Sequence, residues 1–320
     1  MATPAAPGSP RSAFMLVLAI VAMIAVPAAL TLHTVHVSAV VDPTVSNPSP
    51  YGYTFSLLLF IVPALVIAFW FVPREGVQIS RKSFAITIAF LFPLGALLDF
   101  LFAAKFFRFP NRGATLQIAA PALGGSVPVE EYAFYFTGFV FTLLLYIWLD
   151  EYWLAEYGVP STHWARTSFS RILRFHPASV ILAVILIAGA IAYKWYIAKE
   201  PGFPGYFTFL VAGALLPSAA LFPSALPVVN WRAFSLTLFI VLLISLLWEA
   251  TLGFPYGWWG FQDAQMIGIH ITAWSRLPIE EVFVWIAVSY ATVIVYENVR
   301  RWQSTDKSLR EALFGKPGVR

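Results

Sequence analysis

Val127-Pro128-Val129-Glu130-Glu131 recurs as Leu277-Pro278-Ile279-Glu280-Glu281, at an offset of 150 residues (278 − 128). The same offset superposes Asp99 on Glu249. In both copies this isolated acid precedes the first Glu of the Pro-x-Glu-Glu motif by 31 residues (130 − 99 and 280 − 249). Two features repeating at one offset indicate an internal duplication of the chain.

The composition predicts that the duplicated chain lies in a membrane. Of its 320 residues 59% are hydrophobic and only 11% are charged, whereas soluble domains carry roughly 25% charged residues. The mean hydropathy is +0.76. Lys and Arg do not cluster on one face, so we expect no nucleic-acid partner. The absence of cysteine excludes disulfides, thiol catalysis and Cys-ligated metals.

Eight apolar stretches of about 20 residues are long enough to cross the ~30 Å hydrocarbon core of a bilayer. They are Ala13–Val35, Tyr53–Val72, Ser83–Phe107, Val129–Tyr152, Ala178–Ile197, Gly205–Phe222, Trp231–Gly253 and Pro278–Asn298. The second to fourth align with the sixth to eighth, whereas the first matches the fifth only after a shift. We therefore expect an all-α polytopic membrane protein made of two parallel four-helix repeats. The predicted segments are a first repeat at 1–155, a cytoplasmic linker at 156–177, a second repeat at 178–300 and a cytoplasmic tail at 301–320.

The distribution of positive charge predicts the orientation. With the N-terminus inside, only six of the 20 Lys and Arg residues would face outward, namely Lys105, Arg108, Arg112, Lys194, Lys199 and Arg276. Because Lys and Arg are enriched on the cytoplasmic side, both termini are predicted to be cytoplasmic. The first span is expected to be retained rather than cleaved, since its apolar run is too long for a signal peptide.

Carboxyl groups within the spans are the candidate catalytic residues. Six of the sixteen Asp and Glu lie in or at the edge of the predicted outer half of a span: Asp99, Glu130, Glu131, Glu249, Glu280 and Glu281. Charges at bilayer depth are costly and usually functional, and the span directions place all six near the outer end. Carboxyls crowded in a low dielectric cannot all ionise, so a protonated and an ionised neighbour could act as general acid and base.

The Pro-x-Glu-Glu motif also has a structural interpretation. Proline suits the first turn of a helix, and carboxylates there complement the helix dipole. This interpretation does not account for Asp99 and Glu249, which lie on the preceding spans. The five histidines are scattered and we find no glycine-rich nucleotide fingerprint. We therefore expect no metal and no organic cofactor.

The stretch between the last two spans is rich in aromatic residues: Phe254, Tyr256, Trp258, Trp259, Phe261 and Trp274. An aromatic belt at the membrane surface explains most of them. Alternatively, some of these rings line a pocket, where they would stabilise a carbocation and exclude water.

These residues carry a resemblance to a known family. The order Trp248-Glu249, Trp258-Trp259-Gly260 and Leu277-Pro278-Ile279-Glu280-Glu281-Val282 resembles the membrane-integral lycopene cyclases of the heterodimeric or fused type. Bacterial members often consist of two small subunits with one Pro-x-Glu-Glu each. The resemblance covers roughly residues 50–155 and 200–300, and it implies that this chain corresponds to both subunits fused.

The resemblance implies cyclisation of the ψ end groups of lycopene, or of a related linear carotenoid, to β-ionone rings. An acid protonates the terminal double bond, the neighbouring double bond attacks the cation, and a base removes a proton, with no net redox change. The four Glu of the two motifs would supply acid and base, and the two isolated acids would orient them. The substrate-binding candidates are Phe134, Trp258, Trp259 and Trp274. The implied partners are the carotenoid, membrane lipids and other carotenoid enzymes, in a bacterial-type cell membrane.

The sequence departs from the family pattern after the motif, where paired phenylalanines are common. The first copy continues as Tyr132-Ala133-Phe134-Tyr135-Phe136 and the second as Val282-Phe283-Val284-Trp285. The ring type, the number of ends cyclised, and one composite site against two separate sites stay open. Alternative functions are a C50 carotenoid cyclase, a carotenoid hydratase or, in another class, a small-substrate transporter, because tandem repeats and buried acids occur there too.

Overall fold

The computed structural model describes residues 49–158 and 170–315, which are mostly helical. Seven helices in this part of the chain are long and apolar enough to cross a membrane: Gly52–Arg74, Arg81–Phe106, Val129–Trp153, Pro177–Ala198, Gly205–Ala225, Trp231–Gly253 and Glu280–Gln303. They match seven of the predicted spans to within a few residues. The remaining prediction, Ala13–Val35, lies outside the described residues. The chain is an all-α polytopic membrane protein.

The first described span is built from the short helices α2 (Gly52–Ser56), α3 (Leu58–Val66) and α4 (Val72–Arg74). The other helices are α5 (Arg81–Phe106), α6 (Val129–Trp148), α8 (Pro177–Ala192), α9 (Gly205–Ala225), α10 (Trp231–Trp248), α11 (Glu280–Gln303) and α12 (Leu309–Phe314). Four spans contain a π-helical segment, at Ile67–Phe71, Leu149–Trp153, Tyr193–Ala198 and Glu249–Gly253. Such segments are frequent at functional sites, and Glu249 begins one of them.

Six short strands lie in the connections. They are β1 (Phe107–Arg108), β2 (Ala119–Ala122), β3 (Gly125–Pro128), β4 (Gly260–Phe261), β5 (His270–Ile271) and β6 (Leu277–Pro278). β2 pairs with β3, and β5 pairs with β6, each antiparallel. These two hairpins occupy the same place in the two copies, directly before α6 and α11. β1 and β4 come from different copies and pair with each other.

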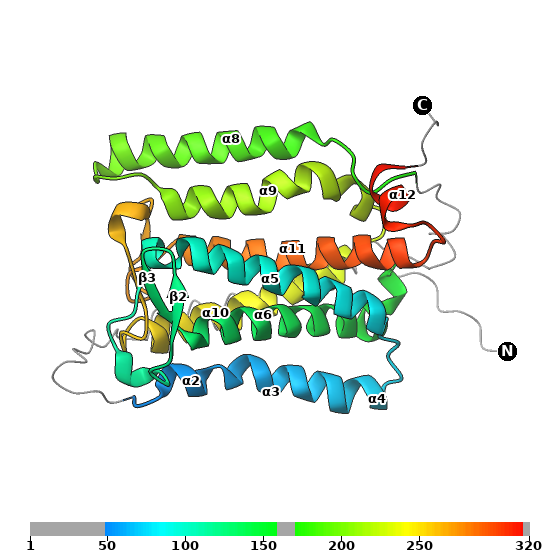
Figure 1. Cartoon of the computed structure of the whole chain (residues 1–320), viewed down its shortest axis with the longest axis horizontal. Helices are drawn as coiled ribbons and strands as arrows, with labels where there is room; N and C mark the ends of the chain where they lie inside the picture. The colour runs from blue at the N-terminus through cyan, green and yellow to red at the C-terminus, as the bar shows by residue number, and fades with distance from the viewer. Residues whose placement is uncertain (1–48, 159–169, 316–320) are drawn as a thin grey trace, which may run out of the picture.

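The helices form one bundle and run through it in alternating directions (Figure 1). α3, α6, α9 and α11 run one way, and α5, α8 and α10 run the other way. The equivalent helices α6 and α11 pack together, α5 contacts α11, and α10 contacts α6, so the two copies interlock. The four helix ends that carry the candidate carboxyls all lie at the end of the bundle where the hairpins are (Figure 1).

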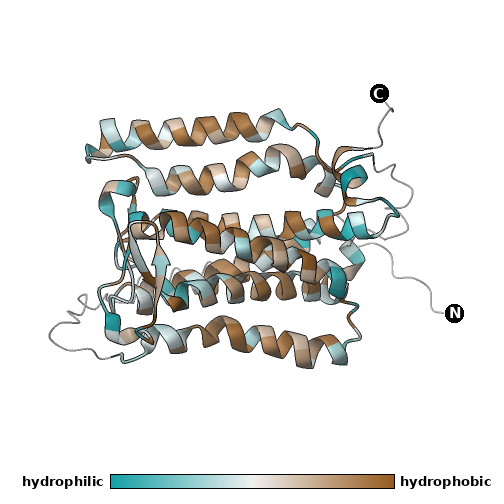
Figure 2. Cartoon of the chain, in the orientation of Figure 1, coloured by the Kyte–Doolittle hydropathy of each residue, from teal (hydrophilic) through white to brown (hydrophobic). Residues whose placement is uncertain are grey.

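The surface of the bundle is suited to lipid. Figure 2 shows hydrophobic residues along the lengths of the helices, with hydrophilic residues gathered towards their ends. Large apolar side chains are exposed on several helices, including Phe69, Trp70, Val184 and Ile185. In water such a surface would be an aggregation hazard, whereas in a bilayer it faces hydrocarbon.

A buried ion-pair network joins the two copies at the other end of the bundle. Arg300 donates to Asp150 over 3.0 Å and to Glu151 over 2.6 Å. The Tyr146 hydroxyl donates to Glu297 over 2.8 Å. Asp150 and Arg300 are equivalent positions of the duplication (300 − 150), and here they carry opposite charges.

The predicted boundary between the second repeat and the tail lies inside α11, which continues to Gln303. α12 then packs against the segment that precedes α8, since the Ile172 N–H donates to the Ala312 carbonyl over 2.7 Å. The Lys307 ammonium also donates to the Ser170 carbonyl over 3.2 Å. The described part of the tail therefore packs against the segment that leads into α8.

Candidate functional site

The first Glu of each motif accepts a hydrogen bond from the backbone of a loop. Glu130 accepts the Leu116 N–H over 2.6 Å, and Glu280 accepts the Ile267 N–H over 2.6 Å. The two contacts are equivalent within one residue of the repeat offset. Glu130 additionally accepts the hydroxyl of Thr54 over 2.6 Å. Both carboxyls are buried, and their bonds hold the loop before each hairpin against the start of the following helix.

The second Glu of each motif faces a cavity between the two copies. Glu131 and Glu281, together with Glu249, line a buried space of about 40 Å³. Its other lining residues are Tyr53, Phe107, Phe109, Phe134, Tyr135, Tyr206, Trp248, Trp259 and Val284. All three carboxyls are at most 7% exposed. Because both copies contribute to one cavity, the structure forms a composite site, which we call the acid cavity.

A tyrosine accompanies each of the second Glu residues. The Tyr53 hydroxyl donates a hydrogen bond to Glu131, and Tyr206 lines the acid cavity with Glu281 and interacts with it electrostatically. Both tyrosines are buried and follow a glycine at the start of a span, as Gly52-Tyr53 and Gly205-Tyr206. The sequence analysis did not single them out, because their offset is 153 (206 − 53) and not 150. A search that allowed small insertions between the copies would have found this Gly-Tyr pair.

Glu249 and Glu281 both line the acid cavity and interact electrostatically. One oxygen of Glu249 accepts the indole N–H of Trp285 over 2.7 Å. Its second oxygen and one oxygen of Glu281 are buried without a hydrogen-bond partner among the described residues. Two neighbouring carboxyls in a dry cavity cannot both ionise at low cost, which favours a proton on one of them.

Asp99 is as buried as Glu249, its counterpart in the second copy, but its contacts differ. It is 2% exposed, and within the described residues neither carboxyl oxygen has a hydrogen-bond partner. It acts electrostatically on Glu131, but it does not line the acid cavity. The structure thus brings together three of the six predicted acids and leaves Asp99, Glu130 and Glu280 around them.

Two of the four predicted substrate-binding residues, Phe134 and Trp259, line the acid cavity. The ring of Trp259 lies 4.6 Å from that of Trp248, centroid to centroid. Trp258 lies behind the wall, where its indole N–H donates to Ser49 over 2.8 Å and its ring stacks on Tyr53. Trp274 is half-buried and lies outside the cavity lining.

Loops from the two copies close the acid cavity at the end of the bundle where the hairpins lie. Phe107 pairs with Phe261 in the β1–β4 ladder, and the Asn111 N–H donates to the Gly257 carbonyl over 3.0 Å. Phe107 and Phe109 from this closure belong to the cavity wall. Bulk water is therefore kept from the carboxyls by aromatic side chains rather than by a polar lid.

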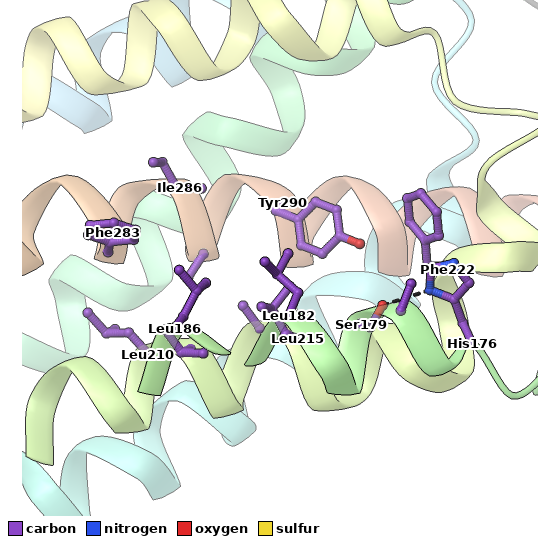
Figure 3. A pocket seen from close by; sticks show the side chains of 14 residues that line it. His176, Ser179, Leu182, Leu186, Leu210, Leu215, Phe222, Phe283, Ile286 and Tyr290 are labelled. Atoms are coloured by element: carbon purple, nitrogen blue, oxygen red, sulfur yellow. Dashed lines mark hydrogen bonds between the residues drawn. The ribbon is translucent and has the colours of Figure 1, made fainter. Parts of the chain in front are cut away.

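A larger groove of about 370 Å³ lies between α8, α9 and α11 (Figure 3). Its wall is apolar along most of its length, and a His176–Ser179 hydrogen bond of 2.8 Å lies at one end (Figure 3). It has no lining residue in common with the acid cavity. This groove is therefore separate from the three carboxyls of the acid cavity.

Within the described residues, no group of three or more His, Asp or Glu is arranged to hold a metal ion. Comparisons with models of protein families, with curated proteins and with solved structures found no match to this chain.

Proposed function

We propose that this protein cyclises the ψ end groups of lycopene, or of a related linear carotenoid, by acid–base catalysis. One observation carries the proposal: Glu131, Glu249 and Glu281, from both copies, converge on one buried cavity with aromatic walls. An apolar substrate reaches such a site from the bilayer, and proton chemistry is what carboxyls can perform there without a cofactor.

In the proposed reaction the Glu249–Glu281 pair shares one proton and is the donor, because two neighbouring buried carboxyls favour keeping a proton on one of them. The proton adds to the terminal carbon–carbon double bond and leaves a tertiary cation. The π electrons of the neighbouring double bond then form the new carbon–carbon bond and close the ring. Glu131, positioned by the Tyr53 hydroxyl, removes a ring proton. Substrate and product have the same atoms.

The aromatic wall supports a cationic intermediate. Phe134, Trp248 and Trp259 border the same cavity as the three carboxyls, and the faces of such rings stabilise positive charge. Closure by the aromatic loops would keep water from adding to the cation. The cavity has room for only a few water molecules, so binding of an end group requires wall side chains to move apart.

The proposal includes an orientation, with the acid cavity near the outer face of a bacterial-type membrane and both termini in the cytoplasm. The chain has no cysteine, so single cysteines report sidedness directly. Ser126 in β3 and Ser304 after α11 are exposed at opposite ends of the bundle. A membrane-impermeant thiol reagent is expected to label Ser126→Cys in intact cells and Ser304→Cys only after lysis. The opposite pattern would reverse the orientation.

Expression in a bacterium that accumulates lycopene tests the activity. We expect lycopene to be converted to a product of unchanged mass with cyclic end groups, and Glu281→Gln to leave lycopene unconverted. A product heavier by one water would instead identify a hydratase, and cyclisation confined to added C50 carotenoids would change the substrate. Unchanged pigment, with the protein present in the membrane, would overturn the proposal.

A further inference from the structure

A second, narrower cavity adjoins the acid cavity between α6 and α11. It has a volume of about 20 Å³ and is lined by Phe134, Tyr135, Gly138, Phe139, Val284, Trp285 and Val288. Phe134, Tyr135 and Val284 also line the acid cavity, so the two spaces are neighbours separated by these shared side chains. We call this second space the slot. None of its lining residues is charged.

Because Gly138 has no side chain, a space remains unfilled in the wall of the slot. Gly138 is buried, yet a Cβ placed on it would meet no atom of the described residues within 4 Å. Protein interiors are normally close-packed, so an empty volume beside a buried glycine is unusual. Gly95 on α5 is tightly packed instead, because an added Cβ there would lie 3.0 Å from Phe139. Here the glycine lets α5 press against the slot from outside.

The slot leads away from the carboxyls along the helix axes. Glu131 to Gly138 on α6 and Glu281 to Val288 on α11 are each seven residues (138 − 131 and 288 − 281), which is about 10 Å of helix. A linear polyene with its end group at the carboxyls must continue in some direction. The aromatic loops close the end where the hairpins lie, and the groove of Figure 3 has no wall in common with the acid cavity.

We propose that the slot binds the apolar conjugated chain of the substrate directly behind the reacting end group, and that Gly138 keeps it open. The inference rests on the proposed function, because it assigns a binding place to the conjugated chain of the same substrate. The slot widens as its aromatic walls separate on binding, and a side chain at position 138 larger than a methyl group would fill the space that the polyene occupies.

Two glycine variants test this assignment. Gly138→Leu is expected to lower turnover of a linear C40 carotenoid at least tenfold. The matched control is Gly213→Leu, since Gly213 lies inside α9, is exposed, and also has no atom within 4 Å of an added Cβ. It is expected to leave turnover unchanged.

Binding is measured separately, from the spectral shift of lycopene added to purified protein in detergent. Gly138→Leu is expected to weaken binding at least tenfold. If it binds and turns over the polyene like wild type, the slot assignment is overturned while the proposed function stands. If wild type binds lycopene without cyclising it and Gly138→Leu loses binding, the slot stands and the cyclase proposal fails. If wild type neither binds nor converts it, both fail.

Folding of each variant is checked by size-exclusion chromatography and thermal unfolding. If Gly138→Leu does not fold, Val288→Phe decides, because Val288 lines the slot from α11. It is expected to reduce polyene binding in the same way. Wild-type binding by a folded Val288→Phe would overturn the slot assignment.

Discussion

The two copies of the repeat place carboxyls at the same positions but surround them differently. Glu130 and Glu280 make the same 2.6 Å bond to a loop N–H, and Glu131 and Glu281 each share the cavity wall with a tyrosine. These pairs have kept their common geometry. The positions of Asp99 and Glu249 have diverged in their hydrogen bonding.

The divergence has a simple structural cause. Glu249 is one methylene longer than Asp99, and it accepts the indole N–H of Trp285 while lining the acid cavity with Glu281. At the position equivalent to Trp285 the first copy has Tyr135 (285 − 150), and Asp99 has no hydrogen-bond partner among the described residues. In the proposed reaction the second copy therefore supplies the proton-sharing pair and the first copy supplies the opposing carboxylate. Duplication followed by divergence has produced one asymmetric site.

The largest expected effect is the loss of activity when Glu281, the second Glu of the second motif, is replaced. Glu281→Gln removes half of the proton-sharing pair, so cyclisation is expected to fall at least about 100-fold, within the range for losing a general acid. Exposed Glu156 supplies the control, Glu156→Gln, with wild-type activity expected. Product formation in the lycopene-accumulating strain is the measurement. A Glu281→Gln variant with near wild-type activity would remove Glu281 from the chemistry.

The next comparison is between the two isolated acids. Glu249→Gln keeps an acceptor for Trp285 but cannot share a proton with Glu281 in the same way, so activity is expected to fall about 10- to 100-fold. Asp99→Asn is expected to lower activity less than about threefold and to leave thermal stability equal or higher, because a buried unpartnered carboxyl is costly. Rates and melting temperatures of both variants check this. Equal losses would mean that the two copies act alike.

The two tyrosines test whether the half-sites contribute equally. A hydrogen bond to a charged group contributes about 1.5–3 kcal/mol, so Tyr53→Phe is expected to slow the reaction about tenfold or more. Tyr206→Phe is expected to have a smaller effect, because Tyr206 acts on Glu281 through the cavity wall. Tyr196 is 76% exposed on α8's π-helical end, and Tyr196→Phe is the control. Unaffected rates in both site variants would assign the tyrosines to packing alone.

The smallest expected effect concerns Glu130 and Glu280, which accept the N–H groups of the loops. In Glu130→Gln and Glu280→Gln the amide oxygen still accepts the loop N–H, so stability is expected to fall by about 1 kcal/mol. Activity is expected to change less than about threefold, since neither residue lines the acid cavity. Thermal unfolding in detergent and product yield are the measurements. An activity loss as large as that of Glu281→Gln would place the first Glu of the motif in the reaction.

Sequence patterns predicted much of the scaffold and part of the site. Span positions follow from local hydropathy, which does not depend on how helices pack. Phe134 and Trp259 were expected to contact substrate and do line the acid cavity. Trp274 was expected beside them but lies outside the lining, because it belongs to the turn of the β5–β6 hairpin, where its N–H donates to the Ile271 carbonyl. Tyr53 and Tyr206 were missed because the loops between the spans differ in length.

By itself, the sequence determined that this chain lies in a membrane, that it is duplicated, and that each copy brings three acids towards one end of the bundle. Those properties depend on composition and on spacing along the chain. Only the tertiary structure decided which of two adjacent Glu residues faces the cavity and that the copies share one site. Neighbouring residues on a helix point about 100° apart, so their surroundings are set by the helices and loops that pack beside them.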